Sequence, residues 1–413
     1  MKIDYVVLDE LDDIGILHDC SANQARGLQG TGLVDVQPEG TETWRLVPNG
    51  TVGVTRVGNL QVQVFPKEGV KVRHLLFLLG YARDPGFRPE DVSAATAEHL
   101  WPALAESLCR AAERALAHGV LQGYHRIDDT LRTVRGRIRM SDQVSRRPGM
   151  MLPLEVTYDE FTVDTAENRL LRTALRQMGQ LPGIDTAIRR RLSHLDARLE
   201  GVNILTPGAA LPTWRPTRLN ERYQGALHLA ELVLRHMSTR VGPGGLFVAS
   251  FVVSMWKVFE DFVSVALTRA LANFPGHTRS QYRTQLDMPR SGRLHGDIEM
   301  MPDIVHTDSQ GHARMVYDAK YKTASPQGKY LNSDYYQILA YCTALQLSEG
   351  WLVFARGHGH GVARKIRHTN ITIHEFPLDL AVTPAELLEQ INELAHRSAG
   401  LETTESTRVC TRT

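Results

Sequence analysis

The sequence predicts an α+β protein of several domains, and three observations predict this fold class. At 413 residues the chain has room for two or three domains, each with its own core. Short alternating segments separated by glycines precede residue 66, and helical periodicity follows them. Strands interleaved with helices fill the last part, which indicates an α/β domain with a mixed sheet. We therefore expect a β-rich N-terminal domain (1–66), a mainly helical middle (67–215) and a C-terminal α/β domain (216–413).

Composition excludes several classes of protein. Lys and Arg number 47 and Asp and Glu 46, which argues against a disordered tail protein and a globally basic DNA binder. The four cysteines form no CxxC pair, so neither a zinc knuckle nor a disulfide framework is indicated. Acids interrupt the N-terminus where a secretory signal needs an apolar core. The longest uncharged stretch, 241–256, falls short of the ~20 residues of a membrane helix and is interpreted as the entry to a buried helix. We expect a cytoplasmic protein without a membrane partner.

The first two regions follow in order along the chain. Turn signals at Gly50, Gly53 and Gly58, with alternation over 61–65, predict short strands. Apolar residues at helical spacing predict helices over 74–79 and 92–118. Asp164, three residues before Glu167, is a candidate helix cap, and the helices continue to about residue 199. The Pro-, Gly- and Thr-containing stretch 205–216 is the best linker candidate.

The middle region holds a basic segment. Seven arginines (126, 132, 135, 137, 139, 146 and 147) stand against three aspartates (128, 129 and 142). Residues 131–138 alternate as a strand would, with arginines on one face that could track phosphates. Arg135, Arg137 and Arg139 are therefore candidate DNA contacts. A solvated edge whose arginines pair with nearby acids explains the same pattern equally well.

The C-terminal region is expected to alternate between helices and strands. The predicted helices and strands are, in order, a helix at 247–274, strands at 279–287, 293–300, 302–307 and 314–321, a helix at 332–348, strands at 351–355 and 366–375, and a helix at 383–398.

Two acids and a lysine end two of these strands. Asp303 follows Pro302, and Asp318 and Lys320 flank Ala319. Side chains alternate faces along a strand, so Asp318 and Lys320 point the same way. If Asp303 lies on the partner strand of a hairpin, both carboxylates and the ammonium converge. Asp297 and Glu299 lie shortly before Asp303 and could be mistaken for this acid.

Two carboxylates with a backbone carbonyl, here that of Ala319, suit Mg²⁺, with Mn²⁺ as a substitute, better than zinc. Such a metal activates water and offsets charge on a phosphate, and Lys320 can stabilise the transition state. A surface ion pair is the alternative explanation of an isolated Asp-x-Lys.

Three more polar residues are candidates for the same site. Glu260 lies beside the apolar stripe of its helix, where a carboxylate needs a partner such as a metal. Gln337 and Tyr341 are one turn apart on one helix face. Pairing of Glu260 with Lys257 or Arg269, and ordinary helix packing of Gln337 and Tyr341, are the alternatives.

The order Glu260, Pro302-Asp303, Asp318-x-Lys320 and Gln337-x-x-x-Tyr341 resembles the PD-(D/E)xK nuclease superfamily, in its RecB-like branch. The blocks Arg135-Gly-Arg-Ile138, Asp164 to Leu171, Phe259-Glu260-Asp-Phe, Asp318-Ala-Lys-Tyr-Lys322 and Asp334 to Tyr341 further resemble the McrC family. McrC is the nuclease subunit of the McrBC modified-cytosine restriction system. The resemblance runs from about residue 58 to 350.

The resemblance implies a restriction-endonuclease-like C-terminal domain and an endonuclease acting on DNA with a separate AAA+ GTPase hexamer, McrB. Asp303, Asp318 and Glu260 would hold the metal, Lys320 would be the catalytic lysine, and Gln337 and Tyr341 would support the site. Lys322 becomes a further candidate DNA contact. The N-terminal part would dock on the GTPase ring. No GxxxxGK[ST] motif occurs in the sequence, so nucleotide hydrolysis falls to the partner.

Two other functions remain open, a non-catalytic activator of a ring NTPase and a stand-alone RecB-like exonuclease. The glycine-rich run with His358 and His360 is interpreted as a hairpin tip with incidental histidines, because histidines in such a loop lack the fixed outer partners of metal ligands. The recognised modification, the stoichiometry and the partner's nucleotide are not predicted by the sequence.

Overall fold

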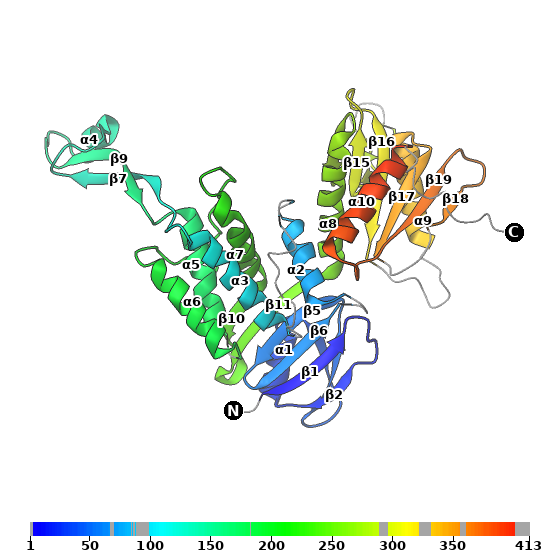
Figure 1. The fold of residues 1–413 in the computed structure, drawn as a ribbon, viewed down its shortest axis with the longest axis horizontal. Helices are drawn as coiled ribbons and strands as arrows, with labels where there is room; N and C mark the ends of the chain where they lie inside the picture. The colour runs from blue at the N-terminus through cyan, green and yellow to red at the C-terminus, as the bar shows by residue number, and fades with distance from the viewer. Residues whose placement is uncertain are drawn as a thin grey trace. The chain divides into compact units, whose positions relative to one another are not determined.

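The computed structural model describes residues 3–66, 70–83, 85, 87, 99–181, 183–288, 296–321, 332–355 and 361–400. The chain forms two compact units. One comprises Met1–Ala103 with His236–Thr413, and the other comprises Leu104–Arg235. Helices and strands occur in both, so the expected α+β class is confirmed (Figure 1). In the described residues no helix is long and apolar enough to cross a membrane.

The N-terminal part of the first unit is built from two sheets and one helix. A five-stranded sheet has the order β1 (Asp4–Asp9), β6 (Leu60–Phe65), β5 (Thr51–Val57), β11 (Phe247–Ser254) and β10 (Met237–Val241). A three-stranded sheet has the order β2 (Ile16–Asp19), β4 (Thr43–Pro48) and β3 (Val34–Pro38), and α1 (Ala22–Gln29) packs on β3 and β5. Gly53 sits where β5 meets β11. A Cβ there would lie 1.9 Å from the carbonyl oxygen of Phe251, so only glycine fits.

Residues 247–254 form a strand, whereas the sequence predicted that a helix starts at 247. β11 pairs antiparallel with β5 from Val248 opposite Val57 to Ser254 opposite Thr51. The helix α8 (Met255–Ala270) begins only after this strand. The segment is buried on most of its length, and a strand buried on both faces has a continuous apolar sequence without the period-2 signal. Thus the five-stranded sheet takes strands from either side of the expected limits at 66 and 216.

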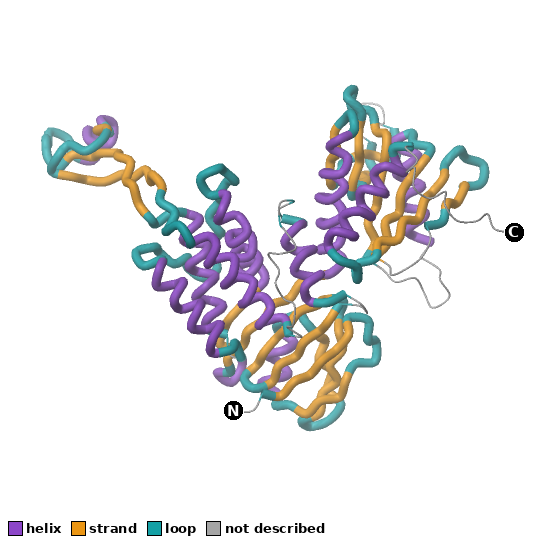
Figure 2. The backbone as a smooth tube through the Cα atoms, viewed as in Figure 1, coloured by secondary structure: helices purple, strands orange, loops and turns teal. Residues whose placement is uncertain are grey.

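The second unit is mainly helical, with one small sheet (Figure 2). Its helices are α3 (Leu100–Leu116), which starts in the first unit, α4 (Met140–Arg146), α5 (Ala166–Gly179), α6 (Thr186–Arg198), η2 (Glu221–Tyr223) and α7 (Gln224–His236). Its sheet has the order β7 (Gly123–Leu131), β9 (Leu154–Thr162) and β8 (Arg137–Ile138).

Two local expectations in this unit differ from the structure. Residues 131–138 were predicted as one strand, but β7 ends at Leu131 and β8 starts at Arg137, with Gly136 at φ 68° between them. Thr165, not Asp164, caps α5 by accepting a hydrogen bond from the Asn168 amide. Asp164 instead binds Arg169 through two hydrogen bonds of 2.7 and 2.6 Å, because a guanidinium offers two donors to one carboxylate.

The C-terminal part of the first unit is a six-stranded mixed sheet, as the sequence predicted. Its order is β12 (His277–Ser280), β15 (Ile304–Thr307), β16 (Ala313–Lys320), β17 (Glu349–Ala355), β19 (Thr372–Leu378) and β18 (Ala363–Lys365). β16, β17 and β19 are parallel, and the other pairs are antiparallel. The remaining elements of the first unit are α2 (Val72–Tyr81), η3 (Pro243–Gly245), η4 (Leu271–Asn273), β13 (Thr284–Gln285), β14 (Glu299–Met300), α9 (Asn332–Leu345) and α10 (Pro384–Ser398).

Helices lie on both faces of this sheet. On one face, Ile338, Tyr341 and Cys342 of α9 form a buried core with residues of β15 to β19. On the other face, the hydroxyl of Tyr317 lies 2.5 Å from that of Ser398, which belongs to α10. Side chains alternate along β16, so Asp318 and Lys320 lie on the face that α9 covers.

Candidate functional site

Two carboxylates face each other across the β15–β16 hairpin. The register pairs Ile304 with Tyr317, which sets Asp303 opposite Asp318 at the end of the hairpin. The amide of Ala319 donates a 2.9 Å hydrogen bond to Oδ2 of Asp303. Asp318 is only 1% exposed. Asp303 directly precedes β15, so the condition under which the sequence expected the carboxylates and the ammonium to converge is met.

Lys320 completes this cluster. Its ammonium lies 2.6 Å from Oδ2 of Asp318, and its side chain is 16% exposed. The predicted convergence of two carboxylates and one ammonium is thus observed. The pair is largely shielded from solvent, so the alternative of an exposed surface ion pair does not describe it.

The cluster holds more negative charge than its one lysine neutralises. Burial, and then the charge of Asp318, raise the pKa of Asp303 to about 6. Burial also raises the pKa of Asp318. Burial alone would lower the pKa of Lys320, but the charges of Asp318, Asp303 and Asp334 outweigh it and raise that pKa. The site therefore favours an added cation at neutral pH.

Glu260 is a third acid near this pair. Burial, and then the charge of Asp303, raise its pKa. Its Oε1 lies 3.3 Å from the ammonium of Lys257, and it accepts a 2.5 Å hydrogen bond from Gln281. One alternative from the sequence, pairing with Lys257, is thus observed. The other does not occur, because Arg269 donates to the carbonyl of Pro85.

Tyr341 and Gln337 lie beside the same cluster. Burial, and then the charge of Asp318, raise the pKa of Tyr341 to about 12. Gln337 donates a 2.7 Å hydrogen bond to the hydroxyl of Tyr341. Asp334, from the first turn of α9, is 3% exposed and adds negative charge near Asp318. No role for Asp334 in the site was expected from the sequence, because only its tertiary position brings it near Asp318.

The donor set fits a hard divalent cation. Oδ1 of Asp318 is buried, and none of the residues that the structure describes donates a hydrogen bond to it. Among the described residues no three His, Cys, Asp or Glu side chains are grouped closely enough to hold a metal. The site thus presents the Asp303 and Asp318 carboxylates with the Ala319 carbonyl nearby. Mg²⁺ suits such a set because it keeps several waters and needs few protein ligands.

The raised pKa of Asp303 predicts how stability depends on pH in metal-free protein. The folded state disfavours the charged carboxylate, so stability should fall as pH rises from about 4 through about 6. Asp303→Asn mimics the protonated acid and should avoid this loss. We expect the variant to exceed wild type by roughly 2 kcal/mol at pH 8 and to match it at pH 4, in urea unfolding with EDTA.

Asp308→Asn, in the turn of the same hairpin, is the matched control. Hydrogen bonds from the amides of His312 and Gln310 outweigh burial and lower the pKa of Asp308. The control should therefore lose stability at pH 8. If Asp303→Asn is less stable than wild type at pH 8, the site does not hold the excess of negative charge that the raised pKa of Asp303 indicates.

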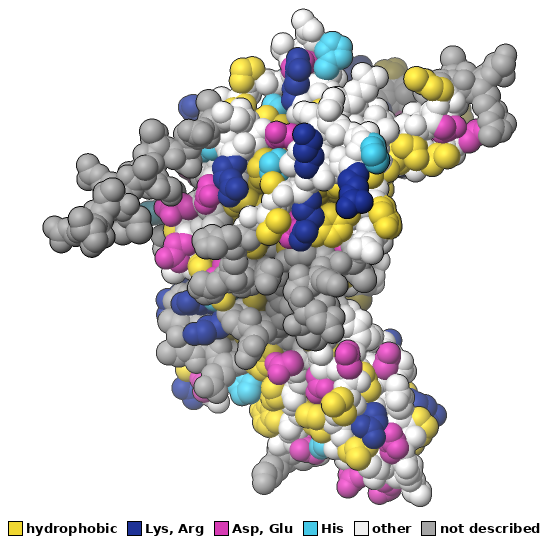
Figure 3. Space-filling view, turned by 90° about the vertical axis from the view of Figure 1, so that its right-hand side faces the viewer, with side chains coloured by type: hydrophobic (Ala, Val, Ile, Leu, Met, Phe, Trp, Pro, Cys, Tyr) yellow, Lys and Arg dark blue, Asp and Glu magenta, His cyan; other side chains and the backbone are white. Residues whose placement is uncertain are grey.

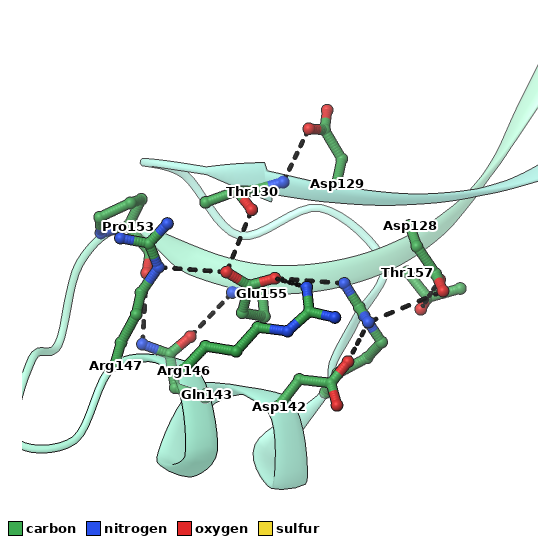
Figure 4. A network of polar contacts seen from close by, with 11 residues as sticks. Asp128, Asp129, Thr130, Asp142, Gln143, Arg146, Arg147, Pro153, Glu155 and Thr157 are labelled. Atoms are coloured by element: carbon green, nitrogen blue, oxygen red, sulfur yellow. Dashed lines mark hydrogen bonds and ion pairs between the residues drawn. The ribbon is translucent and has the colours of Figure 1, made fainter.

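The basic segment of the second unit is held together by Glu155 (Figure 4). Its side chain is 3% exposed and lies 3.1 to 3.6 Å from the guanidinium groups of Arg139, Arg146 and Arg147. Gln143 accepts from the Glu155 amide and donates to the carbonyls of Met150 and Pro153. The role of Glu155 was not predicted from the sequence, because nothing in the local pattern marks this residue as buried.

The candidate DNA contacts differ in their surroundings. Arg139 is paired with Asp142, Asp128 and Glu155, as the alternative interpretation expected. Arg135 stacks 3.8 Å over the ring of Tyr158. Arg137 is exposed on β8. DNA contact by these arginines stays a prediction, and Lys322, His358 and His360 lie outside the described residues.

The chain is similar to a known protein family and to solved structures. The model of a family described as "McrBC 5-methylcytosine restriction system component" matches residues 46–355. This range includes the candidate site residues Glu260, Asp303, Asp318, Lys320, Gln337 and Tyr341. No curated protein matches the chain.

Two solved structures are similar. One is a half-complex from the tetradecameric assembly of Thermococcus gammatolerans McrB AAA+ hexamers with bound McrC. The matched chain is 16% identical, with 96% of this chain and 99% of that chain covered and a TM-score of 0.60. The other is the cryo-EM structure of the T. gammatolerans McrBC complex, at 18% identity over 66% of this chain and 89% of that chain, with a TM-score of 0.42. The first match shows a shared fold.

Proposed function

This chain belongs to the family of McrBC 5-methylcytosine restriction system components, and from that premise we propose that it is the DNA-cleaving subunit of such a system. In this proposal it is a Mg²⁺-dependent endonuclease of the PD-(D/E)xK type that works with an AAA+ GTPase. The observation that carries the proposal is the buried cluster of Asp303, Asp318 and Lys320 on two paired strands.

The donor set supports metal-assisted hydrolysis of a phosphodiester. Asp303, Asp318 and the Ala319 carbonyl would hold Mg²⁺, with Glu260 as an additional acid. When bound, Mg²⁺ supplies an acidified water and offsets negative charge on the phosphate. Without a cation, burial and then the charge of a neighbouring carboxylate raise the pKa values of Asp303 and Glu260.

Lys320 would act on the reacting phosphate or the attacking water. Its raised pKa keeps it protonated at neutral pH, so it serves as a hydrogen-bond donor and a positive charge rather than as a base. The ion pair with Asp318 fixes the ammonium before DNA arrives. Tyr341, oriented by Gln337, would support Asp318 from the α9 side.

The partner proposal rests on three observations. The chain lacks a GxxxxGK[ST] motif, so NTP hydrolysis must come from another chain. The solved structure of similar fold contains McrB AAA+ hexamers with bound McrC. Residues 1–66 include more Asp and Glu than Lys and Arg, and acidic side chains outnumber basic ones at the lower end of Figure 3. Such a surface suits a protein partner better than DNA phosphates.

The experiment is cleavage of plasmid DNA with and without cytosine methylation. The full chain is combined with a McrB-like AAA+ GTPase, GTP and Mg²⁺. We expect strand cleavage that requires both proteins, stops in EDTA and returns with Mg²⁺ or Mn²⁺. Stimulated GTP hydrolysis without any cleavage would favour the activator, and degradation of linear ends by the chain alone would favour the exonuclease.

A further inference from the structure

Gln281 links the two elements that carry Asp303 and Glu260. It directly follows β12, whose register pairs Ser280 with Ile304, so Gln281 lies opposite Asp303. Its backbone amide donates a 2.8 Å hydrogen bond to the Asp303 carbonyl. Its side-chain amide donates the 2.5 Å hydrogen bond to Oε1 of Glu260 on α8. One residue thus bonds the backbone of Asp303 and the side-chain carboxylate of Glu260.

The backbone of Gln281 is held in an unfavourable conformation. Its φ is 49°, in the left-handed region that residues with a side chain rarely adopt. The next amide, of Tyr282, donates a 2.9 Å hydrogen bond to the carbonyl of Pro302 and fixes the turn. Strain of this kind persists only where neighbouring contacts impose it, and it is often found at functional sites.

The second partner of Glu260, Lys257, is less well suited to hold its carboxylate in place. Lys257 is 47% exposed and is shared with Asp261, whose carboxylate lies 3.1 Å from its ammonium. Beside Glu260 and Gln281 lies a cavity of about 200 Å³ with Arg83, Ser264 and Ser280 in its wall. The Glu260 carboxylate therefore borders open space, and the neutral amide of Gln281 restrains it without cancelling its charge.

We propose that Gln281 is a positioning residue that restrains the Glu260 carboxylate near Asp303, so that Glu260 can join the cation site when a metal binds. This inference rests on the proposed function, because it takes Asp303 and Glu260 to serve a bound metal. Partners that orient metal ligands typically contribute about 10- to 100-fold in metal affinity when removed.

The test measures Mn²⁺ binding to the full chain by electron paramagnetic resonance of free Mn²⁺. Gln281→Gly removes the amide and also relieves the positive φ, so the fold is not strained by the change. Gln346→Gly is the matched control. Gln346 is likewise a glutamine at positive φ (57°), exposed after α9. Both variants are also measured in a Glu260→Gln background. Asp303→Asn gives the level of Mn²⁺ binding that remains without the site.

We expect Gln281→Gly to weaken Mn²⁺ binding about tenfold, with unchanged thermal unfolding and no effect of Gln346→Gly. In the Glu260→Gln background the same change should have no further effect, because Gln281 acts through Glu260.

Three results would overturn the inference. These are wild-type affinity in Gln281→Gly, an equal loss with and without Glu260, or an equal loss in the Gln346 control. If Asp303→Asn and wild type bind Mn²⁺ alike, the proposed metal site itself fails, and that failure is distinct from the other three.

Discussion

Asp303→Asn is expected to lower DNA cleavage by about three orders of magnitude, equivalent to about 4 kcal/mol of transition-state free energy. The amide keeps the shape of the acid and can still accept the hydrogen bond from Ala319. It removes one of the two negative charges that would hold Mg²⁺. The measurement is the single-turnover rate of plasmid cleavage with partner, GTP and Mg²⁺.

Stimulation of GTP hydrolysis separates this effect from unfolding or lost docking. The variant should stimulate its partner as wild type does, because Asp303 lies in the C-terminal sheet and the docking part is expected at the N-terminus. Asp308→Asn, in the same hairpin, should cleave at the wild-type rate. Cleavage by Asp303→Asn within a few-fold of wild type would remove Asp303 from the site.

Lys320→Met is expected to lower the cleavage rate about 100- to 1,000-fold while leaving metal binding intact. Methionine keeps the apolar stem in its partly buried position but lacks the ammonium. A positive charge 2.6 Å from Asp318 is thereby lost, so Mn²⁺ should bind at least as tightly as to wild type. The pair of measurements is the cleavage rate at saturating Mg²⁺ and the Mn²⁺ affinity.

The contrast between the two variants is informative. Asp303→Asn should lose metal and cleavage together, whereas Lys320→Met should lose only cleavage. Lys257→Met controls for loss of an ammonium beside another acid, Glu260, and should reduce cleavage far less. If Lys320→Met cleaves at the wild-type rate, the lysine only pairs with Asp318 and has no part in the reaction.

The centre of the site could be predicted because it depends on short-range rules. Alternation along one strand placed Asp318 and Lys320 on one face, and a polar connection with Gly311 predicted the hairpin that brings Asp303 opposite. The position of Glu260 could not be predicted from such short-range rules, because it depends on how α8 packs beside the sheet. Its role in metal binding still rests on the resemblance and stays a prediction.

Long-range pairing explains why the strand over 247–254 was mistaken for a helix. Its eight residues are apolar or small, and periodicity does not separate a strand buried on both faces from a buried helix. The partner that decides the matter, β5, lies almost two hundred residues earlier in the chain. The β-branched residues Val248, Val252 and Val253 were the available signal for a strand.

Gln281 and Glu155 were missed for a related reason. Each residue matters through contacts with several elements, and neither sits in a local pattern that marks it. Gln281 bonds the residue that precedes β15 and a side chain of α8. Glu155 pairs with Arg139 between β8 and α4, with Arg146 at the end of α4 and with Arg147 after it. Arg139, which was predicted as a DNA contact, forms ion pairs with Glu155 and two aspartates instead.

The most direct test of the metal site is anomalous diffraction from a crystal of the full chain grown with saturating Mn²⁺. We expect an anomalous peak from a Mn²⁺ ion bound by the carboxylates of Asp303 and Asp318, next to the Ala319 carbonyl. The peak should be absent in crystals of Asp303→Asn. Well-ordered carboxylates with no peak between them, or with the Lys320 ammonium in the place of the ion, would contradict metal binding by Asp303 and Asp318.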